Sequence, residues 1–158
     1  MRLKSNHVLH MVALSVLFES VFILITIGVS LYYSDGALIG LLATFAVMAG
    51  LGGIALWISG LKPTDPSRRE SFFSVVMVWF AISAFGMLPY LFTGAIPSVV
   101  DAFFETVSGF TTTGSSILND IEALPKSLLF WRATTHFIGG MGIIVLVVAF
   151  LPFFKIGG

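Results

Sequence analysis

The sequence contains no cysteine, and this absence excludes disulfide bonds, thiolate chemistry and metal sites built on cysteine. Charged residues are also few: they fill 10% of the 158 positions, whereas a soluble domain has about a quarter. The eight basic and eight acidic residues cancel, so the net charge indicates neither a nucleic acid nor an acidic partner. With 57% hydrophobic residues and a mean hydropathy of +1.02, the composition predicts an integral membrane protein.

Four apolar stretches are long enough to cross a bilayer as helices, which takes about 20 residues each, so the predicted fold is all-α. They cover residues 8–33, 37–61, 71–92 and 127–154. The first stretch is longer than a signal-peptide core, and no small-residue cleavage site follows it. Ser34, Asp35 and Gly36 form a turn after it, so residues 1–61 are predicted to form a leading transmembrane hairpin.

The most polar part of the chain, residues 62–70, contains two prolines and a cluster of charges, and we expect it to be a loop in water. If the amino terminus is cytoplasmic, this loop and the end of the last span are cytoplasmic too. Most basic residues then lie on the inner side, namely Arg2, Lys4, Lys62, Arg68, Arg69 and Lys155. This distribution follows the positive-inside rule, so we predict a multi-pass protein with a cytoplasmic amino terminus.

Residues 97–116, PSVVDAFFETVSGFTTTGSS, lie between two predicted spans but are too short and too polar to form another one. Ser98 and Asp101 have the serine-x-x-acid spacing that begins a helix. The apolar residues that follow are predicted to be helical and to end at Gly109. Thr111–Ser116 is rich in β-branched and hydroxyl residues, which do not continue a helix comfortably. We therefore expect a short helix that enters the membrane and a backbone that returns to the same side.

Irregular backbone at membrane depth lines a cavity or is buried in protein. The short helix would direct the partial negative charge of its carboxyl end towards the midplane, where it favours a cation. Backbone carbonyls beyond that helix can replace the hydration shell of an ion, as in a selectivity filter. The candidate ion ligands are Thr111, Thr112, Thr113, Gly114 and Ser115. The alternative is a polar turn without an ion.

A second group of residues is predicted to support this short helix, the pore helix. Arg132 lies in the first turns of the last span, and we expect it to pair with Glu105 or Asp101, since all three lie at the same outer depth. Gly139 and Gly140 follow in the same span, and such small residues favour close packing against the filter over a hinge.

The strings GFTTTGSS and WRATTHFIGGMGIIVLVVAFLP resemble the first repeat of the Trk/Ktr superfamily of potassium-uptake proteins. DAFFETVSGFTTTG is similar to the pore helix and filter of that family, with the filter glycine at Gly114. FIGGMGIIVL is similar to the start of the helix that follows, and the leading helix pair resembles the TrkH branch. The resemblance extends over essentially the whole chain.

The resemblance implies a pore built from four span, pore-loop, span repeats in one polypeptide. Residues 71–158 would be the first repeat of a longer chain and would contribute one quarter of the filter. The implied cargo is the potassium ion, coordinated by the carbonyls of Thr111–Gly114 and carried across the inner (plasma) membrane, with no other cofactor in this portion. The implied partners are the remaining repeats, a second copy in a homodimer, a cytoplasmic nucleotide-binding regulatory subunit and the lipid bilayer.

Three alternatives stay open beside this interpretation. The filter lacks the aromatic residue and second glycine of strict potassium channels, so a less selective transporter of potassium and sodium is one of them. Another is a structural or assembly module with a vestigial pore loop, for which changing Gly114 would leave transport intact. An enzyme using Glu19, Asp101 or His136 is disfavoured, because no nucleophile, base and orienting group stand at productive spacing. Glu19 alone is a candidate for a proton path, or for pairing with a partner outside the chain.

Overall fold

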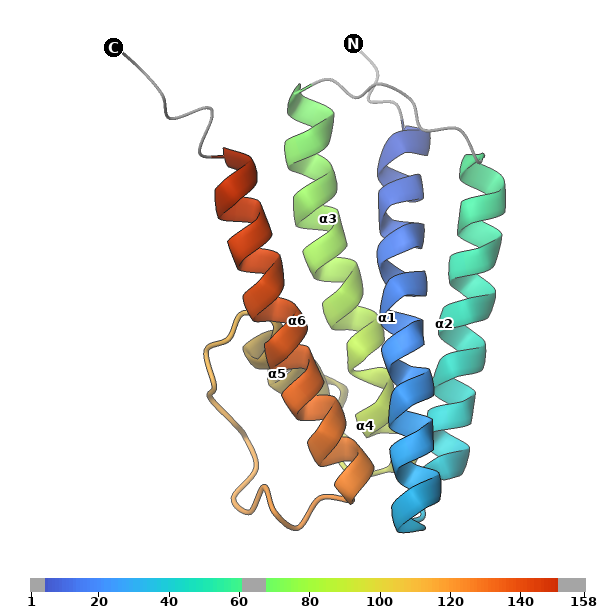
Figure 1. The fold of residues 1–158 in the computed structure, drawn as a ribbon, viewed down its shortest axis with the longest axis vertical. Coiled ribbons are helices and arrows are strands. Elements are labelled where there is room, and N and C mark those ends of the chain that lie inside the picture. The colour runs from blue at the N-terminus through green and yellow to red at the C-terminus, as the bar shows by residue number, and fades with distance from the viewer. Residues whose placement is uncertain (1–4, 61–67, 151–158) are drawn as a thin grey trace.

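The computed structural model describes residues 5–60 and 68–150. Over these ranges the chain is helical without any strand, which confirms the predicted all-α class. The helices are α1 (Ser5–Tyr33), α2 (Leu38–Ser59), α3 (Arg68–Gly86), α4 (Leu88–Thr93), α5 (Val99–Phe110) and α6 (Lys126–Phe150). The long helices run side by side, and α1 contacts α2, α3 and α6 (Figure 1).

The four predicted spans correspond to four apolar helical segments that are long enough to cross a membrane. These segments are Asn6–Tyr33, Leu38–Ser59, Arg69–Thr93 and Lys126–Val145. Large hydrophobic side chains cover their outer surfaces; Ile39 and Trp57 on α2, for example, are each 82% exposed. A helix that is hydrophobic all round suits a lipid environment rather than water.

The predicted loop at residues 62–70 falls mainly outside the described residues, but its last three positions were wrongly predicted. Helix α3 begins at Arg68, and Glu70 lies in its first turn. A negative charge there interacts favourably with the amino-terminal end of the helix dipole, so a charged cluster can begin a helix as well as interrupt one.

The third span is broken between α3 and α4, and Pro89 explains the break because it has no N–H to continue the helical hydrogen bonds. Tyr90 N donates to Met87 O at 3.1 Å, one residue short of the α-helical pattern. The carbonyl of Gly86 accepts instead from the indole Nε1 of Trp131, at 2.9 Å. Trp131 is fully buried, so this bond fastens α6 to the broken end of α3.

The segment after α4 is re-entrant, as predicted. Helix α5 is only 12 residues long, and the chain beyond it returns to the end of the molecule where α6 begins (Figure 1). The turn between α1 and α2 lies at this same end.

The carboxylate of Asp35 connects that turn to the start of α6. It accepts hydrogen bonds from Ser30 Oγ at 2.6 Å, Ala37 N at 3.2 Å and Ser127 N at 2.8 Å. Partial burial tends to raise the pKa of Asp35, but these hydrogen bonds outweigh it and hold the pKa below the ordinary aspartate value. The bond to Ser127 supplies an acceptor to one of the first amides of α6, which have no partner within the helix.

Candidate pore loop

Helix α5 begins as predicted, because Ser98 Oγ accepts a hydrogen bond from Asp101 N at 3.4 Å. The predicted end at Gly109 was wrong, since the helix continues to Phe110. Gly109 is buried within the last turn, and a Cβ there would collide with the hydroxyl of Thr135 on α6. The glycine therefore permits close approach of two helices, and the helix ends for another reason.

That reason is a pair of hydrogen bonds from the threonine run. Thr112 N donates to Gly109 O at 2.9 Å, and Thr113 N donates to Ser108 O at 3.0 Å. This arrangement is a Schellman motif, in which the residue after the cap takes a left-handed conformation and is usually glycine. Here it is Thr112, with φ of +56°. A left-handed conformation costs a residue with a Cβ about 1–2 kcal/mol, so the turn holds local strain at the candidate filter.

The five candidate ion ligands lie together at the end of α5, and all five are exposed on the surface of this chain. Thr111 and Thr113 place their hydroxyl oxygens 2.8 Å apart, and Thr111 Oγ1 also lies 2.8 Å from a carbonyl of the last turns of α5. Gly114 has φ of +78°, a conformation that favours glycine. The carbonyl of Ser115 accepts a hydrogen bond of 2.5 Å from Ser108 Oγ, so it is tied back to α5.

Glu105 anchors the returning backbone and α6 to the pore helix. Its side chain is fully buried and accepts from Arg132 Nε at 2.7 Å, Ser116 Oγ at 2.9 Å and Ile117 N at 3.1 Å. The predicted pairing of Arg132 is therefore realised with Glu105, while Asp101 lies at the amino-terminal end of the helix. The sequence offered no signal for the bond to the Ile117 amide, because every residue type except proline carries that donor.

The glycines of α6 lie directly behind the end of α5. A Cβ at Gly139 would collide with the carbonyl of Phe110, whereas one at Gly140 would make an ordinary contact of 3.8 Å with Thr112. The expected close packing is confirmed at Gly139, where the helix backbone itself touches the pore helix.

His136 hydrogen-bonds within its own helix. Its Nδ1 lies 2.9 Å from the carbonyl of Arg132 in its own helix. Within residues 5–60 and 68–150, no three His, Asp or Glu side chains lie close enough together to hold a metal ion.

The part of the chain that contains the pore helix matches a known protein family. Residues 38–158 match the family model TrkH, described as "Cation transport protein". The chain belongs to this family. Its match to the model includes α2, the re-entrant segment and α6.

Several TrkH-family proteins are similar to this chain over most of its length. The Trk system potassium uptake protein TrkH of Salmonella typhimurium is 40% identical over 131 residues, which are 82% of this chain and 27% of that protein. The Trk system potassium uptake protein TrkG of Escherichia coli strain K12 is 35% identical over 152 residues, 96% of this chain and 31% of that protein.

A solved structure has the same fold. The crystal structure of the potassium transporter TrkH from Vibrio parahaemolyticus superposes with a TM-score of 0.87 at 37% identity, over 97% of this chain and 33% of that one. The present chain thus spans about a third or less of the length of these TrkH-family relatives.

Proposed function

We propose that this chain contributes one pore loop to a pathway that carries potassium ions across the cell membrane. The observation that carries the proposal is the run Thr111–Gly114, whose residues are exposed and non-helical and lie at the end of a half-length helix between two spans. Exposed backbone at membrane depth is tolerated where it lines a water-filled cavity. The choice of potassium as the ion is based on the names of the relatives, which are potassium uptake proteins.

In this proposal the carbonyls of Thr111, Thr112, Thr113 and Gly114 replace water around the dehydrated ion. The carboxyl end of α5 adds a partial negative charge at the same place. Ser115 has a different role, because its carbonyl already accepts from Ser108, and it fixes the end of the filter to the pore helix. The transport function requires no catalytic residue and no cofactor other than the transported ion.

One loop surrounds only one side of an ion, so the proposal requires further loops. We propose that residues 71–158 are the first of four repeats and that residues 1–61 are a leading hairpin. The chain spans 27% and 33% of two relatives, so those proteins are long enough to contain further repeats. By the resemblance to the Trk/Ktr superfamily, the complete protein is a homodimer in the inner membrane, with a cytoplasmic amino terminus and a cytoplasmic nucleotide-binding regulatory subunit.

The proposal is tested by potassium and sodium fluxes in liposomes that contain the complete protein. Gly114→Ser should reduce potassium flux or abolish the preference for potassium, because serine tolerates a φ of +78° poorly. Gly36→Ser is the matched control: Gly36 has φ of +80° and similar open space around it, but it lies in the turn between α1 and α2.

Unchanged flux and selectivity in Gly114→Ser would overturn the filter assignment and favour a structural module with a vestigial pore loop. Equal fluxes of potassium and sodium through the unmodified protein would instead identify a less selective cation transporter.

A further inference from the structure

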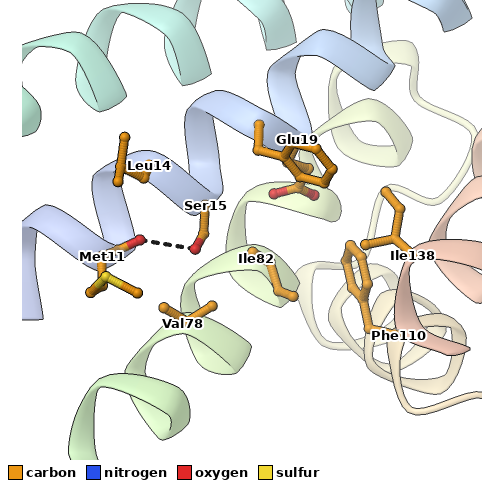
Figure 2. Close-up of a pocket in the computed structure, with 9 residues that line it drawn as sticks. Met11, Leu14, Ser15, Glu19, Val78, Ile82, Phe110 and Ile138 are labelled. Atoms are coloured by element: carbon orange, nitrogen blue, oxygen red, sulfur yellow. Dashed lines mark hydrogen bonds between the residues drawn. The ribbon is translucent and has the colours of Figure 1, made fainter. Parts of the chain in front are cut away.

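A cavity of about 270 Å³ lies beside the pore helix, between α1, α3, α5 and α6 (Figure 2). Its walls are hydrocarbon side chains, among them Val78, Ile82 and Ile138, together with the ring of Phe110. The one carboxyl group in the lining is that of Glu19, the middle residue of α1. A spanning helix places its middle residue near the bilayer midplane, so this acid lies as far from water as the helix allows.

Glu19 is 2% exposed, and neither of its carboxyl oxygens has a hydrogen-bond partner among the described residues. In Figure 2 the carboxyl group points from α1 towards α3, with Phe110 across the cavity. A Cβ built on Gly86 of α3 would lie 2.7 Å from Glu19 Oε1 and 2.9 Å from both the Phe110 ring and a methyl group of Thr106. The acid therefore meets the broken end of α3 and the end of the pore helix at one crowded point.

The neighbouring helices supply no charge that would compensate a carboxylate here. Helix α2 contains no titratable residue, and the charged residues of α3 lie in its first turn, far from Gly86. On α4 and on the other elements around the cavity the titratable groups are His7, His10, Tyr32, Tyr33, Tyr90, Asp101, Glu105, Lys126, Arg132 and His136. Arg132 of α6 is already paired with Glu105.

The chemistry of the cavity selects its ligand. A hard metal cation takes about six or more oxygen ligands, and the hydrocarbon walls offer almost none. Ser15 has the other side-chain oxygen in the lining, and its hydroxyl donates to the carbonyl of Met11 at 2.9 Å. A proton needs a single oxygen and leaves no net charge in the hydrocarbon, where an unpaired carboxylate is costly.

We propose that Glu19 is a proton-binding site at the middle of the membrane and that its protonation state is coupled to the pore loop through Phe110. Ionisation would place a negative charge beside the carboxyl end of α5, which already has a partial negative charge. The carboxylate would then recruit water into the cavity or move within it, and Phe110, which lines the same cavity and approaches the same point of α3, would shift with it. This coupling, unlike the proton site itself, rests on the proposed transport function.

The proton site is tested without any measurement of transport. Dicyclohexylcarbodiimide reacts with protonated carboxyl groups in apolar surroundings, and mass spectrometry of the complete protein locates the modified residue. We expect Glu19 to be labelled, with labelling that falls as the pH rises and is absent in Glu19→Gln. Ser15→Ala changes the same cavity without removing the acid, so it should retain the labelling.

Infrared spectroscopy supplies a second measurement that does not depend on access of the reagent. The unmodified protein should show the C=O stretching band of a protonated carboxylic acid that Glu19→Gln lacks. Absence of both the label and the band at every pH would overturn the site, and would mean that Glu19 is ionised and paired with a cation from another part of the complete protein.

Coupling to the pore loop is tested by potassium flux in liposomes as a function of pH. Flux through the unmodified protein and Ser15→Ala should change several-fold with pH, whereas Glu19→Gln, which resembles the neutral acid, should be insensitive. Identical pH profiles in all three proteins would overturn the coupling and leave the proton site intact. A protein that is labelled at Glu19 but carries no potassium would contradict the proposed function instead.

Discussion

The buried ion pair between Glu105 and Arg132 gives the sharpest test of how the pore loop is held. Glu105→Gln retains an acceptor for Ser116 and Ile117 but removes the charge that faces Arg132. Removing one member of a buried pair costs about 3–5 kcal/mol, because the other charge is left uncompensated. Arg132 is 18% exposed and retains some access to solvent. We therefore expect Glu105→Gln to lower the free energy of unfolding by an amount near the lower limit, about 3 kcal/mol.

Glu105→Leu separates the ion pair from the anchoring of the returning backbone. It also removes the acceptor for Ser116 Oγ and Ile117 N, and each loses a hydrogen bond worth about 1 kcal/mol, part of which water restores. Because this stretch is partly exposed, we expect Glu105→Leu to be about 1 kcal/mol less stable than Glu105→Gln.

The assay is the free energy of unfolding of the complete protein in mixed micelles, measured for both Glu105 variants, Arg132→Gln and the double variant Glu105→Gln/Arg132→Gln. The interaction energy between Glu105 and Arg132, obtained from the double-mutant cycle, should exceed about 1 kcal/mol, as is usual for groups in direct contact. Glu122→Gln, a change of an exposed acid in the loop before α6, is the control and should stay within about 0.5 kcal/mol of the unmodified protein.

Additive effects of the two single changes would refute the reasoning, since they would mean that the 2.7 Å contact contributes nothing to stability. A charge reversal, Glu105→Arg with Arg132→Glu, provides a further criterion. It should recover part of the stability lost in each single reversal if the pair itself is what matters.

Two further changes test the packing behind the pore helix and the link between the hairpin and α6. Gly139→Ala should destabilise the protein by about 1–3 kcal/mol, because its Cβ meets the carbonyl of Phe110, whereas Gly140→Ala should be neutral or slightly stabilising; equal effects on the unfolding free energy would contradict this packing. Asp35→Ala should cost about 1 kcal/mol at neutral pH by removing the acceptor of an α6 amide. Because the pKa of Asp35 is lowered, its contribution is present above the ordinary value of 3.8 and is lost as the pH falls through the lowered pKa. The unmodified protein should therefore lose stability in this acidic range by a step that Asp35→Ala lacks, and an identical step in both would exclude Asp35 as its source.

The spans and the re-entrant segment could be predicted because they depend on properties that sequence displays directly. Hydropathy identifies four spans, and the polar run after a short apolar helix cannot cross the membrane. Shared depth in the membrane limited the predicted partner of Arg132 to two acids, Glu105 and Asp101. The choice between them depends on the direction of each side chain around α5, and Glu105 is on the face that meets α6.

The end of the pore helix was predicted wrongly because glycine has two uses that a sequence does not distinguish. Gly109 was interpreted as a helix terminator, but it is required where Thr135 approaches α5. The left-handed position that usually takes glycine is occupied by Thr112 instead. Deciding between these uses requires knowledge of what lies opposite each glycine, and that partner is more than twenty residues away in the chain.

The contacts around α5 also indicate what determines the position of the backbone of the proposed filter. Glu105 holds the returning limb through Ile117, Gly139 lets α6 pack closely against the carbonyl of Phe110, and Ser108 holds the carbonyl of Ser115. None of these three supporting residues belongs to the threonine run that would contact the ion. The strain at Thr112 can persist because the surrounding groups fix both ends of the run. In the proposed potassium pathway, selectivity should therefore be sensitive to changes in α6 and in the body of α5 as well as to changes in the threonine run itself.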